Sequence, residues 1–140
     1  MYMLLPQDIQ SKVSRNYQCI NESQMTSILT VLVKFRNVCA HGERLFTYRT
    51  VDSIPDLPIH VKLNIPQKGV QYVNGKNDLF SVVIALKYML SDYWYKSFIK
   101  ELKSLIEKYL KKHDSISEQE LYERMGFPEN WKKVTRYRKQ

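Results

Sequence analysis

The feature that most constrains this chain is a long and almost uninterrupted apolar helix, predicted from about Met25 to His41. Between Ile28 and Ala40 the only polar side chains are those of Thr30, Lys34, Arg36 and Asn37. A helix that is apolar on nearly every side is expected to lie buried at the centre of a fold. Arginine and asparagine need partners there, because desolvating them unpaired costs several kcal/mol. The pattern therefore predicts a central helix that carries a polar site near its end.

The polar residues at this helix end have a spacing that suits phosphodiester chemistry. Asn37 and His41 lie one turn apart on one face, and Arg36 lies roughly 140° around the axis from His41, yet is long enough to border the same groove. If Gly42 ends the helix, the dipole favours protonated His41 and nearby Arg36 opposes it. A histidine that moves protons beside a cation that holds phosphate is suited to phosphodiester chemistry. The spacing alone also fits a structural role, with Arg36 capping carbonyl groups.

A resemblance to a known family rests on three segments of the sequence. The central one is Arg36-Asn37-Val38-Cys39-Ala40-His41 followed by Arg44-Leu45-Phe46, and the others are residues 5–12 and 125–131. Together they resemble the C-terminal half of the Abi-like (abortive infection) proteins of bacteria. That family is similar to the HEPN superfamily, in which an R-x(4–6)-H motif marks metal-independent ribonucleases.

The resemblance implies a site, a partner and an assembly. Arg36 and His41 match the catalytic pair, Asn37 matches the polar residue that often follows the arginine, and Arg44 is expected to bind RNA. HEPN proteins bring two motifs together across a homodimer. Phe46 stands where the family pattern has tryptophan. Family members usually carry a further helical N-terminal half, so a missing N-terminal half or a regulatory partner is also expected.

Composition supports a globular protein with an acidic partner. The 140 residues are 44% hydrophobic, which fits one domain with its own core. The net charge of +8 favours an acidic partner such as nucleic acid, although a merely soluble basic protein is the alternative. Two cysteines, Cys19 and Cys39, do not make a disulfide framework and fit a reducing cytoplasm. We expect no metal, no cofactor and no membrane segment.

The rest of the chain is predicted to form helices on either side of one irregular insert. Helices are predicted over 6–17, 79–90 and 92–112 and from Ser117 to Gly126. Capping residues mark the helix starts: Asn77 or Asp78, Ser91 and Ser117, with Asn21 and Gln24 as a capping box ahead of the central helix. Prolines and glycines predict a loop or small β-hairpin insert over 43–77, pairing 61–65 with 69–73, and His60 is read as a surface loop residue. This insert follows the Arg36–His41 motif directly, so it is expected to form one wall of the site. Trp131 is expected to anchor the chain end. Residues 132–140 form a basic tail, either disordered or bound to RNA through Lys132, Lys133, Arg136 and Arg138.

These observations predict one all-α domain over residues 1–140, a HEPN-like helical bundle with an irregular or small β-hairpin insert. The leading functional hypothesis is a metal-independent RNA endonuclease of a bacterial abortive-infection system, acting against phage. The alternative is a non-catalytic RNA-binding or protein-interaction module of the same type, and a third is a purely structural fragment.

Overall fold

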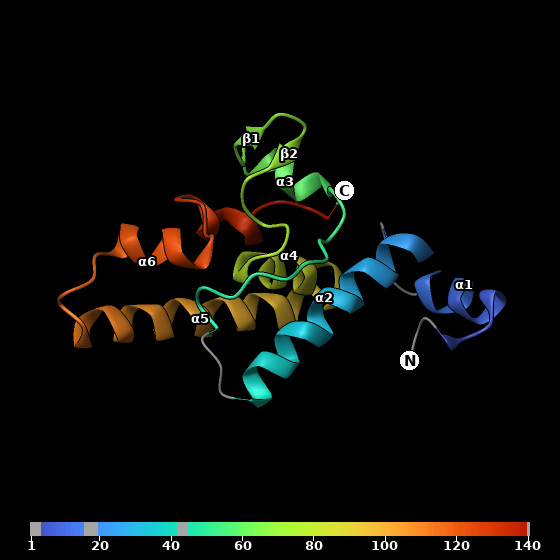
Figure 1. Cartoon of the computed structure of the whole chain (residues 1–140), viewed down its shortest axis with the longest axis horizontal. Coiled ribbons are helices and arrows are strands. Elements are labelled where there is room, and N and C mark those ends of the chain that lie inside the picture. Colours follow the sequence, from blue (N-terminus) through green and yellow to red (C-terminus); the bar gives the residue numbers. More distant parts are fainter. Residues whose placement is uncertain (1–3, 16–19, 42–44, 140) are drawn as a thin grey trace.

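The chain folds into a mostly helical structure with one very small hairpin, as seen in a computed structural model that describes residues 4–15, 20–41 and 45–139. The elements follow in the order α1 (Gln7–Arg15), α2 (Glu22–Ala40), α3 (Pro58–Lys62), β1 (Gln67–Lys68), β2 (Gln71–Tyr72), α4 (Leu79–Met89), α5 (Asp92–Lys112), α6 (Glu118–Met125) and the 3₁₀ helix η2 (Trp131–Thr135). In Figure 1, α2 crosses the molecule obliquely and α6 runs back in the opposite direction to α5. The predicted all-α class with a small hairpin is confirmed.

Helix α4 lies at the centre of the fold, because α2 and α5 both pack against it. Phe80, Ile84 and Ala85 of this helix are fully buried. Its first turn is capped by Asp78, whose carboxylate accepts a hydrogen bond from the backbone N–H of Ser81. The middle of α4 is tied to α5, because the Tyr95 hydroxyl donates to the Val83 carbonyl over 2.8 Å.

Helix α2 begins where the sequence predicts but is buried on one face only. Asn21 and Gln24 form the predicted capping box, each side chain accepting from the other residue's backbone N–H. The buried face consists of Met25, Ile28, Val31, Phe35 and Val38. Val33 is 51% exposed, and Arg36 and Asn37 are also exposed. The expectation of a helix covered on nearly every side is therefore wrong, because Leu32 and Cys39 border an open pocket and Val33 is exposed outside it.

The segment between α2 and α4 contains a helix that the sequence reasoning missed. Residues 58–62 form α3, with Pro58 at a position where its missing N–H costs nothing. The predicted pairing of 61–65 with 69–73 is wrong, because 61–62 belong to α3. The hairpin instead pairs Gln67 with Tyr72 and Lys68 with Gln71 around Gly69, whose φ is +68°. The predicted hairpin insert exists, but its first strand comes later in the chain.

His60 is fully buried, which contradicts its assignment to a surface loop. Its Nδ1 accepts from the Leu57 N–H at 3.0 Å, so its Nε2 carries the proton and donates to the Gly75 carbonyl at 2.8 Å. Its ring also stacks on Tyr72, with centroids 4.9 Å apart. His60 therefore fastens α3 to the hairpin and to the turn before α4.

The C-terminal segment is ordered and docked onto the fold, so a disordered tail is excluded for the residues described. Trp131 and Val134 are fully buried, and η2 packs against α5. The buried Lys87 ammonium donates to the carbonyls of Val134 and Tyr137 at 2.7 and 2.6 Å. Its burial lowers the pKa of Lys87 to about 8.

One hydrophobic core runs through the described part of the chain, from Ile20 to Val134. Phe80, Phe127 and Trp131 meet within it, with Phe127 5.1 Å from each of the other two ring centroids. In the described ranges, none of the helices has the length and apolar character to cross a bilayer.

Candidate functional site

The C-terminal half of α2 separates two concavities, and the predicted site residues are divided between them. The smaller has a volume of about 270 Å³ and takes Asn37 and His41 from α2. The larger is an apolar pocket of about 620 Å³ that takes Arg36 and Cys39 from the same helix.

Asn37 and His41 share the smaller concavity because they are four residues apart and so lie one above the other on α2. His41 is the C-cap of the helix, and its backbone N–H donates to the Asn37 carbonyl at 3.0 Å. Both side chains are exposed. The other lining residues are Lys34, Val38, Tyr48, Arg49 and Val51. An imidazole and an amide therefore open on a solvent-accessible hollow beside an arginine.

The wall opposite α2 is held in place by contacts with three other parts of the fold. The Tyr48 ring packs edge-on against Phe35 of α2, at a centroid distance of 5.2 Å. Arg49 donates from Nη2 to the Arg124 carbonyl at the end of α6, at 3.1 Å. The next residue, Thr50, exchanges hydrogen bonds with Asn77. Tyr48 and Arg49 are thus positioned by α2, α6 and the start of α4 together.

Lys34 is the second cation of the smaller concavity, and it is already paired. Its ammonium forms an ion pair and hydrogen bond with Asp52, and this bond raises the pKa of Lys34. The pair links α2 to the loop that carries Arg49. Both side chains are well exposed, so the pair adds little to stability. Arg49 forms no ion pair within 4 Å among the described residues, although its charge acts on the buried carboxylate of Asp78.

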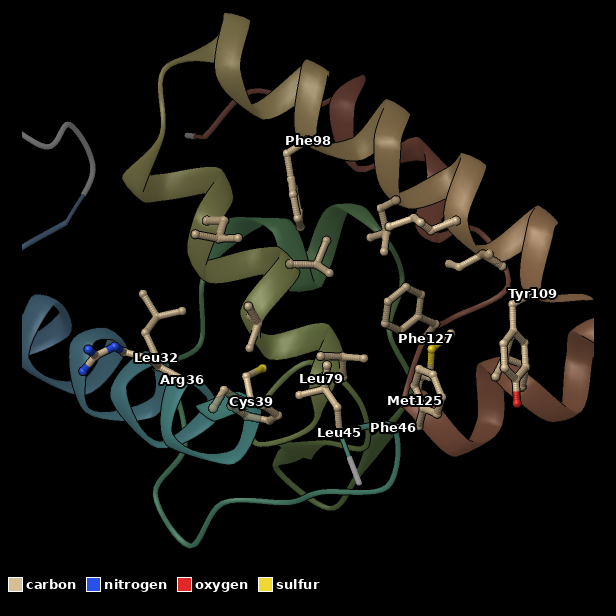
Figure 2. A pocket seen from close by; sticks show the side chains of 18 residues that line it. Leu32, Arg36, Cys39, Leu45, Phe46, Leu79, Phe98, Tyr109, Met125 and Phe127 are labelled. Atoms are coloured by element: carbon tan, nitrogen blue, oxygen red, sulfur yellow. The ribbon is translucent and has the colours of Figure 1, made fainter. Parts of the chain in front are cut away.

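Arg36 lies at one end of the larger pocket (Figure 2). The rest of that pocket is almost wholly apolar, with walls from α2 and α5 and a floor from α4. Arg36 is exposed and makes no hydrogen bond or ion pair with any residue in the described ranges. It therefore does not cap carbonyl groups, which was the structural alternative for this residue.

Within one copy of the chain, then, Arg36 and His41 do not border one groove. The five-residue separation turns them by about 140°, and the part of α2 between them includes Val38, which is buried and lines the smaller concavity. The length of the arginine does not overcome this separation. The structure brings together Asn37 and His41, and it adds Arg49.

The remaining predicted RNA-binding residues lie elsewhere. Lys132, Lys133, Arg136 and Arg138 are exposed on and after η2. Arg44 and Gly42 lie outside the described residues. Arg49 and Tyr48 were missed by sequence reasoning, although their position eight and seven residues after His41, in the segment expected to wall the site, was a usable signal.

The described ranges contain no group of three or more His, Cys, Asp or Glu side chains that could hold a metal ion. Two buried titratable groups near the start of α4, Asp78 and His60, have shifted pKa values. Burial raises the pKa of Asp78 to about 6 and lowers the pKa of His60. Neither lines either concavity, but the charge of Arg49 in the smaller concavity acts on Asp78 and opposes the rise in its pKa.

Comparison with known proteins gives one match. Residues 1–47 match the family model described as Abi-like protein, whereas no curated protein and no solved structure matches the chain. The matched segment contains α1, α2 and the whole Arg36–His41 motif. The resemblance to Abi-like proteins is thereby confirmed for this part of the sequence. Over its first third, which includes Arg36, Asn37 and His41 but not Arg49, the chain is similar to the Abi-like protein family.

Proposed function

We propose that this chain is a metal-independent RNA endonuclease of a bacterial abortive-infection system, with a site of HEPN type. One observation carries the proposal: an exposed histidine and asparagine, inside the Abi-like segment, share a hollow with the exposed Arg49, which forms no ion pair within 4 Å among the described residues. The similarity to Abi-like proteins points to abortive infection. The net charge of +8 favours a polyanionic substrate.

In this proposal, His41 takes the proton from a ribose 2′-hydroxyl or gives one to the leaving oxygen. The freed 2′-oxygen attacks the adjacent phosphorus, the bond to the 5′-oxygen breaks, and a 2′,3′-cyclic phosphate remains. Asn37 orients the imidazole or the phosphate. Arg49 lies in the same hollow and stabilises charge that develops on the phosphate oxygens.

A second copy of the chain would supply Arg36. Since Arg36 and His41 open on different concavities of one copy, a two-fold dimer is needed to bring Arg36 to the partner's His41. We therefore propose a homodimer with α2 near the axis. Light scattering should give a molar mass of about twice the 16.7 kDa of one chain. A strict monomer would remove Arg36 from the mechanism.

The test is cleavage of RNA in EDTA by the wild-type chain and by His41→Ala. Removing a group that transfers protons should reduce the cleavage rate by about 10²-fold or more. Removing the charge of Arg36 or Arg49, by substitution with glutamine, should also reduce it strongly. Circular dichroism should show an unchanged helix content in all three variants, since the three side chains are exposed.

The chain offers a matched control in His113. It is the C-cap of α5 as His41 is of α2, it is exposed, and it lines neither concavity. His113→Ala should leave cleavage unchanged. Equal activity in wild type and His41→Ala, or loss in EDTA, would contradict the proposal.

The separation of Arg36 from His41 in one copy also favours a second candidate function. This is a non-catalytic RNA-binding or protein-interaction module of HEPN type. Such a module would retain the basic surface, but Arg36 and His41 would never come together in one site. RNA binding without cleavage, at protein concentrations where the dimer forms, would support this alternative.

A further inference from the structure

The larger concavity is formed because α2 and α5 pack on different sides of α4 and do not cover it completely. Leu79, Val82 and Leu86 lie along one face of α4 and remain partly exposed between the two helices. Apolar residues of α6 and Phe127 close one end of the pocket (Figure 2). The result is a hydrophobic trough that follows the axis of α4.

The size and lining of this pocket suit a small apolar molecule. Its volume of about 620 Å³ lies within the roughly 300–1,000 Å³ range of ligand pockets. Water gains few hydrogen bonds against such walls, so displacing it with an apolar group is favourable. Leu105 on the open side is 62% exposed and would be covered by such a ligand.

The polar groups of the pocket are few and lie at its ends. Figure 2 shows Arg36 at one end, with its guanidinium beyond the apolar walls, and Tyr109 at the other. Arg36 is the one lining residue with a full charge among the described residues, and it has no partner there. A guanidinium is a preferred partner for carboxylate and phosphate groups. A ligand that matches both the apolar walls and the guanidinium of Arg36 has an apolar chain and one anionic end.

We propose that the pocket bounded by α2, α4 and α5 binds an aliphatic chain that ends in an anionic group. The chain lies along Val82 and Leu86 of α4, and the anionic group pairs with Arg36. Cys39, one turn from Arg36 on the same wall, is covered when the chain is bound. The ligand is either a free aliphatic acid or the anionic lipid of a membrane surface, which share this chemistry.

One consequence concerns activity and rests on the proposed function. A ligand that pairs with Arg36 removes that guanidinium from phosphate, so occupancy should inhibit RNA cleavage. Binding itself does not depend on cleavage. A failure of the nuclease proposal therefore leaves the binding proposal testable, and the reverse also holds.

Isothermal titration with decanoate tests the proposal, with 1-decanol as the uncharged comparison. The wild-type chain should bind decanoate at one site, and decanol about tenfold more weakly, since an ionised hydrogen-bonding partner is lost. Arg36→Gln should weaken decanoate binding about tenfold and leave decanol binding unchanged. Absence of decanoate binding, or equal affinity of wild type and Arg36→Gln for decanoate, would overturn the proposal.

Two exposed apolar residues give a matched pair for the chain-binding part of the pocket. Leu105 is 62% exposed and lines it, whereas Val33 on α2 is 51% exposed and does not. Leu105→Gln should weaken binding of both probes, and Val33→Gln should weaken neither. Equal effects of the two substitutions would show that binding is non-specific and overturn the proposal.

The reactivity of the Cys39 thiol gives a second measurement that does not depend on calorimetry. It is made on a chain in which Cys19 is replaced by serine. Bound decanoate should slow the reaction of the Cys39 thiol with a maleimide reagent, and an unchanged rate would contradict the placement of the ligand. Sedimentation with phosphatidylglycerol vesicles separates the two sources. Sedimentation that depends on Arg36 and Leu105 assigns a membrane lipid, and decanoate binding without sedimentation assigns a free acid.

Discussion

Asp78 shows how one residue can serve a local and a global role. Its carboxylate accepts hydrogen bonds from the backbone N–H groups of Gly75 and Ser81, at 3.0 to 3.1 Å, and so caps α4. It is only 2% exposed, and burial raises its pKa to about 6 despite these hydrogen bonds. Between about pH 4 and 6 the folded chain therefore holds more protons than the unfolded chain. Asp78 thus makes stability fall as pH rises through this window, by about 3 kcal/mol in all.

The first prediction for a single residue is that Asp78→Asn removes the fall in stability that Asp78 causes between about pH 4 and 6. Asparagine is a good N-cap and its Oδ1 can accept the same N–H groups, so the helix start should survive. The variant should gain stability over wild type as pH rises from 4 to 7, as measured by urea unfolding. Comparing the two chains cancels the opposite contribution of His60, whose lowered pKa makes stability fall as pH drops.

Asp114→Asn, at an exposed turn, is the matched control and should keep the wild-type slope. A constant difference between Asp78→Asn and wild type across the range would contradict a raised pKa. The sequence predicted a cap at Asn77 or Asp78, because capping depends on residues three apart. It could not predict the burial of Asp78, which Gly126 covers from the far end of the chain.

At the scale of single elements, the sequence predicted most helix ends and missed one helix. Asn21, Ser91 and Ser117 cap α2, α5 and α6 as expected, because each cap is a local hydrogen bond within one turn. Helix α3 is different. It is short, begins at a proline, and is stabilised by burial of His60 against the hairpin, which is information that no local pattern carries.

A prediction for α6 concerns Gly126, which ends that helix in the left-handed conformation with a φ of +75°. A Cβ atom there would lie 2.2 Å from Oδ2 of Asp78, so the cap of α4 would have to move. Gly126→Ala should therefore lower the free energy of unfolding by about 3 kcal/mol, combining backbone strain with overpacking. Thermal and urea unfolding measure this.

Gly69 at the hairpin is the matched comparison, because its φ is +68° and no atom lies within 4 Å of an added Cβ. Gly69→Ala should cost only the backbone strain, about 1 kcal/mol. If both substitutions cost the same, the contact between Gly126 and Asp78 contributes nothing.

At the scale of the whole molecule, docking of the C-terminal segment fixes where its cations lie. The backbone of this segment is fastened by Lys87, while Lys132, Lys133, Arg136 and Arg138 remain exposed. These four charges therefore form a surface and not a free tail. The sequence predicted the charges, but their fixed position depends on burial of Trp131 and Val134.

We predict that replacing these four residues with glutamine weakens RNA binding and flattens its salt dependence. Each lost phosphate contact removes about 0.7 from the slope of log K against log salt for a single strand, so the slope should fall by about 3. Filter binding at several salt concentrations measures it. Neutralising four exposed lysines elsewhere, Lys12, Lys68, Lys111 and Lys112, is the control for net charge. Equal slopes for the two variants would show that the C-terminal cations are not a specific RNA surface.

The division of the site between two concavities is also a property of the whole molecule. The spacing of Arg36, Asn37 and His41 predicted which residues share a face of α2. Which face of α2 borders a concavity depends on how α4, α5 and the segment around Arg49 pack against it. The spacing of residues within α2 carries no information about that packing.

The burial of Trp131 also has a consequence for synthesis of the protein. Trp131 packs against Phe127 and Tyr122, and the Lys87 ammonium in the last turn of α4 donates to the carbonyls of Val134 and Tyr137. A nascent chain in which residues 131–137 are still inside the ribosome therefore leaves α4 partly uncovered, with that ammonium lacking both carbonyls. The ribosome-bound intermediate should be a substrate for chaperones, and the fold should become stable only when residues 131–137 emerge.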